Sequence, residues 1–253
     1  NDVSFIRDQP VAGTSTLAVG APKFNNNEGE VFIYELSGAT SSSASTTLVQ
    51  RITAAPGDSF SGSGFGHSLA SWKNYWGEFL VVGAPAIGHA TAPGAVFVFK
   101  KAPTSSAFVQ VSKVTASDGA AGDQFGKAIA ATYWQSFVGV GAPADDDKGT
   151  DSGSIYVFWQ DYVRGTLNQS QKLVPSDGAA GDAFGSALAY IGSGFAIGAP
   201  GSDASGIDSG RAYQSNYNSS FFSFSFVAPE AISFSNVSAG DRLGSSVDGT
   251  NQY

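Results

Sequence analysis

Residues 117–126 read Ser-Asp-Gly-Ala-Ala-Gly-Asp-Gln-Phe-Gly, and the chain returns to nearly the same phrase at residues 176–185. The first seven residues of the phrase are identical in the two copies. After each copy comes a short apolar run that ends in Gly-Ala-Pro. An internal repeat of this kind decides the architecture, because each copy forms the same local structure and buries its apolar faces against its neighbours.

Three short markers recur in the same order along the whole chain. Gly-Asp begins at residues 57, 122, 181 and 240, Phe-Gly at 65, 125 and 184, and Gly-Ala-Pro at 20, 83, 141 and 198. Leu243-Gly244 is a degenerate fourth copy of Phe-Gly, and the steps between the four copies are 60, 59 and 59 residues. We therefore divide the single domain, residues 1–253, into units at about 1–56, 57–116, 117–175 and 176–235, with residues 236–253 completing the first unit.

Each unit contains four short runs that are rich in aromatic and β-branched residues and bounded by Gly, Pro, Asp or Ser, which is typical of strands. In the third unit we expect these strands at 125–133, 137–141, 154–159 and 171–174. No segment shows a sustained helical period. The pattern predicts an all-β fold, a β-propeller of about four four-stranded antiparallel blades.

The two ends of the chain complement each other. The C-terminal segment from Leu243 resembles a first strand without its blade, while the N-terminal unit has later strands but no clear Phe-Gly before them. We expect the two ends to pair and close the ring. The alternative is an open arrangement in which residues 3–6 form the first strand of the first unit.

Composition narrows the function classes. The net charge is −8, which argues against nucleic acid and against an anionic membrane surface as partners. The chain has no cysteine, so it has no disulfide framework, no thiolate metal site and no cysteine nucleophile. No apolar run reaches the ~18 residues that a membrane-spanning helix needs.

The constellation Phe-Gly, Gly-Ala-Pro and Gly-x-Val/Ile-Phe/Tyr-Val-Phe resembles the FG-GAP repeat, the blade of integrin-α-type β-propellers. The resemblance covers residues 17–247. It implies a β-propeller with an extracellular role in adhesion, recognition or scaffolding. Family blades often carry a calcium loop, Asp-x-Asp-x-Asp-Gly, between the Phe-Gly and Gly-Ala-Pro strands. Here that connection has no such loop in any unit, so the calcium ligands of the family are not carried over.

A different loop contains alternating carboxylates that could converge on Ca²⁺, a cation that takes six to eight oxygen ligands. The fourth unit keeps two of these acids. The candidate metal ligands are Asp145, Asp146, Asp147, Asp151, Asp203 and Asp208. The alternative is a pair of solvated turns in which the aspartates cap backbone amides.

The aspartates of the Gly-Asp marker, Asp58, Asp123, Asp182 and Asp241, recur once in each unit. Recurrence indicates a structural role, an Asx-type turn that leads into the first strand, with metal binding as the alternative.

Three sequons fit N-glycosylation, at Asn168, Asn218 and Asn236. The Ser/Thr-rich stretch 37–47 predicts a flexible loop that could carry O-glycans.

One loop gathers Trp72, Tyr75 and Trp76. Exposed aromatic side chains suit sugar stacking or a protein-binding hot spot, and the alternative is packing over an adjacent blade.

Catalytic machinery is not recognisable. The two histidines, His67 and His89, belong to no nucleophile or metal pattern, and His67 stands where the other units have Lys127, Ser186 and Ser245.

We predict a non-catalytic extracellular binding or adhesion module for a protein or glycan, secreted or at the cell surface. The alternatives are a structural subunit of a filament, wall or surface layer that binds copies of itself, and a propeller-type glycan hydrolase or lyase. Ca²⁺ is the one cofactor that the sequence suggests.

Overall fold

The computed structural model describes residues 3–6, 14–37, 45–58, 60–132, 137–161, 163–220 and 223–249. Strands dominate this part of the chain, which confirms the all-β class. Its one helical segment, α1 (Phe24–Asn27), is a single turn in which Asn25, Asn26 and Asn27 have positive φ. None of the described helical structure is long and apolar enough to cross a membrane.

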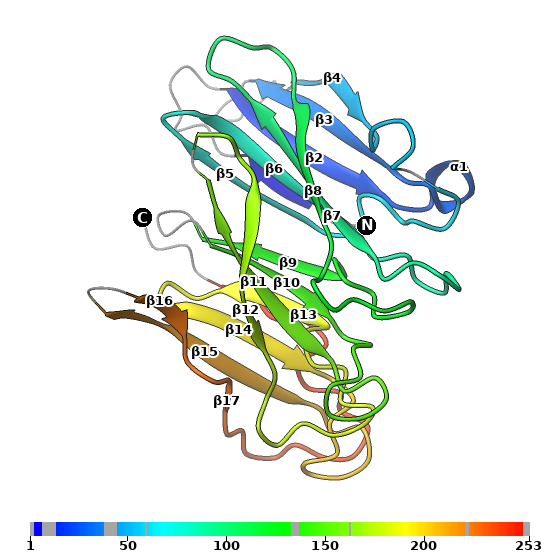
Figure 1. Cartoon of the computed structure of the whole chain (residues 1–253), viewed down its shortest axis with the longest axis vertical. Coiled ribbons are helices and arrows are strands. Elements are labelled where there is room, and N and C mark those ends of the chain that lie inside the picture. The colour runs from blue at the N-terminus through cyan, green and yellow to red at the C-terminus, as the bar shows by residue number, and fades with distance from the viewer. Residues whose placement is uncertain are drawn as a thin grey trace.

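The strands form four antiparallel sheets that follow the order of the chain (Figure 1). The first sheet contains β1 (Val3–Ile6), β2 (Thr14–Ala21), β3 (Glu30–Ser37) and β4 (Ser45–Ile52). The second contains β5 (Leu69–Asn74), β6 (Gly77–Ala84), β7 (Ala95–Lys101) and β8 (Val109–Val114). The third contains β9 (Ala128–Ala131), β10 (Phe137–Ala142), β11 (Ser154–Gln160) and β12 (Leu167–Leu173). The fourth contains β13 (Ala187–Tyr190), β14 (Gly194–Ala199), β15 (Arg211–Ser220), β16 (Ser223–Phe226) and β17 (Glu230–Ala231).

The four sheets repeat one another in detail. The outer pair of strands shifts register after Ile33 in the first sheet, after Val98 in the second and after Val157 in the third. A β-bulge at the same position of these three sheets increases the local twist of each. The predicted repeat therefore extends to the hydrogen-bond ladder.

The sheets lie one after another along the long axis of the molecule (Figure 1). Their first strands, β1, β5, β9 and β13, contact one another in sequence. Three clusters of buried apolar side chains occupy the interfaces between successive sheets in the described part of the chain. This arrangement is propeller-like, with the first strands innermost and the fourth strands outermost.

The phenylalanine of Phe-Gly is inserted between successive sheets. Phe125 is fully buried, and its ring lies 5.4 Å from that of Tyr156 and 5.9 Å from that of Phe158, edge to face. Its amide donates to the carbonyl of Pro93, in the loop that precedes β7. Phe125 therefore joins the second sheet to the third. The predicted first strand at 125–133 begins only at Ala128 because residues before it connect the sheets.

The two glycines of the repeat meet at the same interface. The amide of Gly126 donates to the carbonyl of Gly141 in its own sheet, at 3.0 Å. On its other side the carbonyl of Gly126 lies so close to Gly83, in the preceding sheet, that a Cβ on Gly83 would collide with it. Gly83 and Gly126 must both be glycine, because no side chain fits between these backbones.

The predicted pairing of the two chain ends is not found among the described residues. The first sheet takes its first strand from β1, which pairs with β2 from Val3↔Val19 to Ile6↔Thr16. Leu243 instead bridges to Gly210 on the fourth sheet, as Phe184 bridges to Gly153 on the third. Residues 236–249 therefore extend the fourth sheet and do not complete the first. The alternative with residues 3–6 as first strand is the one that the structure shows.

The predicted loop at 37–47 is shorter than expected. Ser37 ends β3 and Ser45 begins β4, and their hydroxyls lie 2.7 Å apart. Residues 38–44 lie outside the described residues.

Replacing Phe125 by Ala should lower the free energy of unfolding by about 3–5 kcal/mol, because it empties a buried ring position between two sheets. Leu243→Ala, at the equivalent but half-buried position on the fourth sheet, should cost much less. Urea denaturation of both variants measures the difference. Equal losses would contradict the role of Phe125 as a wedge between sheets.

Candidate functional site

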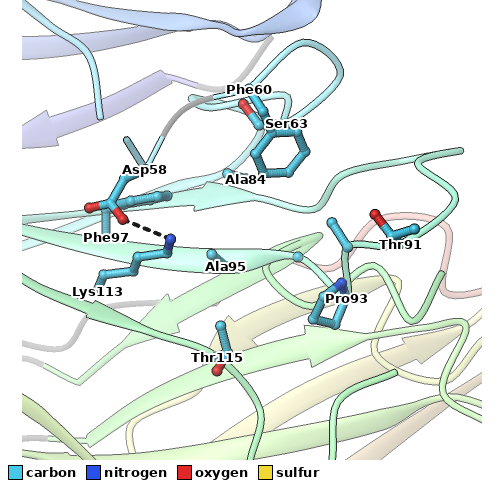
Figure 2. Close-up of a pocket in the computed structure, with 12 residues that line it drawn as sticks. Asp58, Phe60, Ser63, Ala84, Thr91, Pro93, Ala95, Phe97, Lys113 and Thr115 are labelled. Atoms are coloured by element: carbon cyan, nitrogen blue, oxygen red, sulfur yellow. Dashed lines mark hydrogen bonds and ion pairs between the residues drawn. The ribbon is translucent and has the colours of Figure 1, made fainter. Parts of the chain in front are cut away.

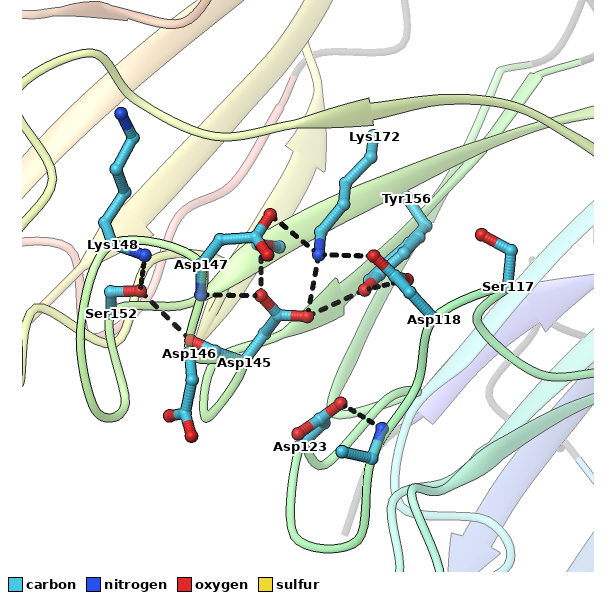
Figure 3. A network of polar contacts seen from close by, with 12 residues as sticks. Ser117, Asp118, Asp123, Asp145, Asp146, Asp147, Lys148, Ser152, Tyr156 and Lys172 are labelled. Carbon is cyan, nitrogen blue, oxygen red and sulfur yellow. Dashed lines mark hydrogen bonds and ion pairs between the residues drawn. The ribbon is translucent and has the colours of Figure 1, made fainter.

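An extended polar network lies in the third sheet around Lys172 of β12 (Figure 3). Its ammonium nitrogen is 2.8 Å from Asp118 Oδ2, 3.0 Å from Asp145 Oδ2 and 2.8 Å from Asp147 Oδ2. Asp118 comes from the connection before the third sheet, and Asp145 and Asp147 from the loop between β10 and β11. One positive charge therefore holds three segments together.

The hydroxyl of Tyr156, in β11, lies 2.8 Å from Asp118 Oδ1 and 2.7 Å from Asp145 Oδ2, and it donates to one of them at a time. The other oxygen of Asp145 accepts from the Ser154 hydroxyl at 2.9 Å and from the Asp147 amide at 3.2 Å. The Asp145 carboxylate is almost fully buried, and these donors together with Lys172 satisfy it. Such full satisfaction is what allows a charge to remain in a protein interior.

Burial raises the pKa of Tyr156, and hydrogen bonds to Asp145 and Asp118 raise it further, so the hydroxyl keeps its proton. Burial alone would lower the pKa of Lys172, but hydrogen bonds to Asp118, Asp147 and Asp145 outweigh it and the pKa is raised. Neither group titrates near neutral pH. The network is therefore suited to fixing the loop and unsuited to moving protons.

Of the six predicted metal ligands, Asp145 and Asp147 come together, but on the ammonium group of Lys172. Asp146 points away from the network and accepts the amide of Asp151 at 2.8 Å, and Asp203 accepts the amide of Asp208 at the same distance in the fourth unit (Figure 3). These are the backbone-capping turns of the alternative interpretation. The described residues contain no group of three His, Cys, Asp or Glu side chains arranged to hold a metal ion.

Three aspartates of the Gly-Asp marker have a structural role, but not through the Asx-type turn into the first strand that we expected. Asp123, Asp182 and Asp241 each accept the amide of the residue three positions earlier, at 2.6–2.9 Å. Burial raises the pKa of Asp123 and of Asp182. The turn closes backward along the connection, and it does not run forward into the first strand.

Asp58 was assigned to the wrong position of the repeat. Its carboxylate accepts from Lys113 at 2.8 Å and from Gln110 Nε2 at 3.1 Å, as Asp118 accepts from Lys172. Ser63 is the buried residue two positions before Phe65, where the third unit has Asp123 two positions before Phe125. The second unit has a longer connection than the third, which placed Gly57-Asp58 out of register.

Sequence reasoning missed a basic residue that recurs over an aromatic ring. In each sheet a cation lies 5.1–5.9 Å from a ring centroid and pairs with a carboxylate. The pairs are Arg51 over Phe32, Lys113 over Phe97, Lys172 over Tyr156 and Arg211 over Tyr213. Their acids are Glu30, Asp58, Asp118 and Asp177. The signal was present as a basic residue directly before the last apolar residue of the fourth strand, in Arg51-Ile52, Lys113-Val114 and Lys172-Leu173.

The predicted aromatic cluster is divided between core and surface. Trp72 is buried and stacks on Phe79, with ring centroids 5.3 Å apart and planes inclined by 10°. Its inclusion in a ligand surface was wrong, because in β5 this side chain faces the third sheet. Tyr75 and Trp76 lie at the tip of the β5–β6 hairpin, 86% and 46% exposed. Their rings meet edge to face at 5.3 Å.

The three sequon asparagines are all exposed. Asn168 lies in β12, Asn218 in β15, and Asn236 in the connection after β17, where its φ is +66°. Their accessibility is compatible with glycosylation, which stays a prediction.

His67 is largely buried between the sheets. Burial lowers its pKa to about 4, and the positive charge of Lys127 contributes. The imidazole is therefore neutral at physiological pH.

Part of the chain matches a known repeat family. The family model of the FG-GAP repeat matches residues 108–158 and 167–213, which include β8 to β11 and β12 to the beginning of β15. The molecule is thus an all-β repeat protein, and these two segments of its chain match the FG-GAP repeat, as the resemblance indicated. A sequence comparison with curated proteins gives no match.

A comparison with solved structures finds distant similarities. A putative 6-phosphogluconolactonase from Bacteroides fragilis is 13% identical with a TM-score of 0.49, over 88% of this chain and 57% of its own. Sqt1 from Saccharomyces cerevisiae is 12% identical with a TM-score of 0.40, over 79% of this chain and 41% of its own. This chain spans less than two thirds of either protein, and both likenesses are too weak to indicate a function.

Replacing Lys172 by Met should lower the free energy of unfolding by about 3 kcal/mol or more, because it leaves the buried Asp145 without its cation. Lys113→Met is the matched control, since it frees one part-exposed carboxylate and should cost about 0–1 kcal/mol. Urea denaturation at pH 7 compares the two variants. Equal losses would show that the network around Lys172 is no more than a surface ion pair.

His67→Ser should remove part of the pH dependence of stability. The folded pKa of His67 is about 4 and lies below the ordinary value of about 6.5, so the unfolded state binds more protons between these two pH values. The wild type should therefore lose stability as the pH falls through this window, and the serine variant should lose less. Serine is the residue of two other units at this position. Identical slopes of unfolding free energy against pH would contradict the assignment.

Proposed function

We propose that this chain is a non-catalytic extracellular binding module that recognises a protein or glycan through the tip of the β5–β6 hairpin. The exposed aromatic pair Tyr75 and Trp76 carries the proposal. The FG-GAP repeats support it, since the family resemblance implies recognition or adhesion outside the cell.

The hairpin tip is held in one conformation. The amide of Trp76 donates to Asn74 Oδ1 at 2.8 Å, which closes an Asx-type turn, and Gly77 takes a φ of +142° directly after it. Close behind the tip, the buried Trp72 pairs with Phe79 across the hairpin and stacks on its ring, which fixes the strands to the core. A tip that is already ordered loses little conformational entropy when a partner binds.

The exposed chemistry fits a sugar ring or an apolar pocket. Tyr and Trp combine a large apolar face with a polar group, and these two residue types dominate hot spots of protein interfaces. Edge-to-face packing of the two rings at 89° leaves both presented to solvent. A pyranose could stack on either ring, and a protein partner could enclose both.

The absence of catalysis is part of the proposal. The carboxylates of Asp118 and Asp145 are occupied by Lys172 and Tyr156, and His67 is partly buried and neutral. These contacts favour a binding module over the hydrolase or lyase alternative. The structural-subunit alternative stays a prediction.

The double variant Tyr75→Ala/Trp76→Ala tests the role of the tip. Secreted wild-type protein is first screened against immobilised glycans and extracellular matrix proteins. Binding to each hit should then fall at least about tenfold in the double variant, because hot-spot aromatics contribute about 2 kcal/mol or more each. Thermal unfolding should be unchanged, since both side chains lie outside the core.

Trp159→Ala is the matched control for this experiment. Trp159 is 42% exposed on β11, in another sheet, so its loss should leave binding intact. A double variant that binds every hit as the wild type does would exclude the hairpin tip as the recognition site.

A further inference from the structure

The second sheet also contains a cavity (Figure 2). Its volume is about 220 Å³, and it lies between the connection before the sheet, the β6–β7 loop and the faces of β7 and β8. The side chains that matter most to its chemistry are Phe60, Pro93, Ala95, Phe97 and Lys113. Lys113 forms an ion pair with Asp58 at one end of the cavity (Figure 2).

The same place in the third sheet can be identified from strand pairing. Ala95 pairs with Ala84 as Ser154 pairs with Ala142, so Ala95 and Ser154 are equivalent. Phe97 pairs with Lys113 as Tyr156 pairs with Lys172. The cavity in the second sheet therefore corresponds to the interior of the Lys172 network.

In the third sheet this place is filled by a carboxylate. Asp145 enters from the loop after Gly-Ala-Pro and accepts from Ser154, Tyr156 and Lys172. In the second sheet the corresponding loop residue is Ile87, which is 47% exposed. The cavity exists because the second unit lacks the side chain that fills it in the third unit.

We propose that the cavity binds a small organic carboxylate, whose anionic group lies beside Lys113 in the place of the Asp145 side chain. Its apolar part contacts Phe60, Pro93 and Phe97. The third sheet supplies the argument, since the molecule itself places a carboxylate against the equivalent lysine.

Lys113 can pair with a second carboxylate in addition to Asp58. Lys172 is shared by three carboxylates, whereas the carboxylate paired with Lys113 is that of Asp58. The hydrogen bond from Lys113 lowers the pKa of Asp58, so this carboxylate is charged at neutral pH. An ammonium group has three donors, and a ligand carboxylate can accept from one that Asp58 does not use.

The residues that line the cavity favour a compact, mostly apolar ligand. Ala95 and Phe97 have no hydroxyl where Ser154 and Tyr156 have one, and Lys113 is the one cation of the lining. The lining also includes the hydroxyl residues Ser63, Thr91 and Thr115, and its remaining side chains are mostly apolar. The ring of Phe60 is held by an edge-to-face contact with His89 at 4.7 Å. A cavity of about 150 Å³ admits benzene, so a ring with one carboxylate suits this space.

Titration of the full chain with benzoate, followed by amide chemical shifts in two-dimensional NMR, tests the proposal. We expect benzoate to shift the amides of Gly94 and Ala95, and benzyl alcohol, its neutral counterpart, to bind at least about tenfold more weakly. Lys113→Met should weaken benzoate binding by a similar factor, since the variant removes one charge-assisted hydrogen bond. Ala95→Leu should abolish binding because it fills the cavity.

Two further variants complete the design. Lys148→Met removes an exposed lysine outside the cavity and should leave benzoate binding unchanged. The Tyr75→Ala/Trp76→Ala variant should also bind benzoate normally, so failure here and failure of the hairpin tip are separate results. If Ala95→Leu does not fold, Lys113→Met decides alone. Benzoate shifts that are absent, that persist in Lys113→Met, or that benzyl alcohol reproduces at equal concentration would overturn the proposal.

Discussion

The insertion of Phe-Gly between successive sheets is the constraint on which the rest of the molecule depends. The ring of Phe125 fills the interface of two sheets, while Gly126 lies between the backbones of Gly83 and Gly141. Neither sheet could bury its face alone, because an isolated antiparallel sheet leaves one or both faces in water. The Phe-Gly and Gly-Ala-Pro markers are therefore two halves of one contact, and their spacing repeats because the contact does.

A repeated interface also gives each unit the same set of positions, which different side chains can use differently. The cation over the aromatic ring is present in every sheet, but its surroundings vary. In the third sheet Asp145 fills the space beside Lys172, and in the second sheet the space beside Lys113 is a cavity. The backbone geometry is shared, so the side chains at equivalent positions decide whether this place holds an ion network or a cavity.

The hairpin tip and the cavity are independent of the network that stabilises the fold. Tyr75 and Trp76 extend beyond the sheets, whereas the contacts of Lys172 join three segments of the third unit. A binding function located at such tips can change without loss of stability, because substitutions there leave the interfaces between sheets intact.

The sequence by itself determined the repeat and the strand class, because these follow from local residue patterns at a regular spacing. Only the tertiary structure decided that Trp72 is buried while Tyr75 is exposed, and that Asp58 matches Asp118 and not Asp123. It also decided that the chain ends do not pair among the described residues. The physical reason is that burial and charge pairing depend on partners more than fifty residues away, such as Lys172 for Asp118, and no local pattern specifies which side chain will arrive there.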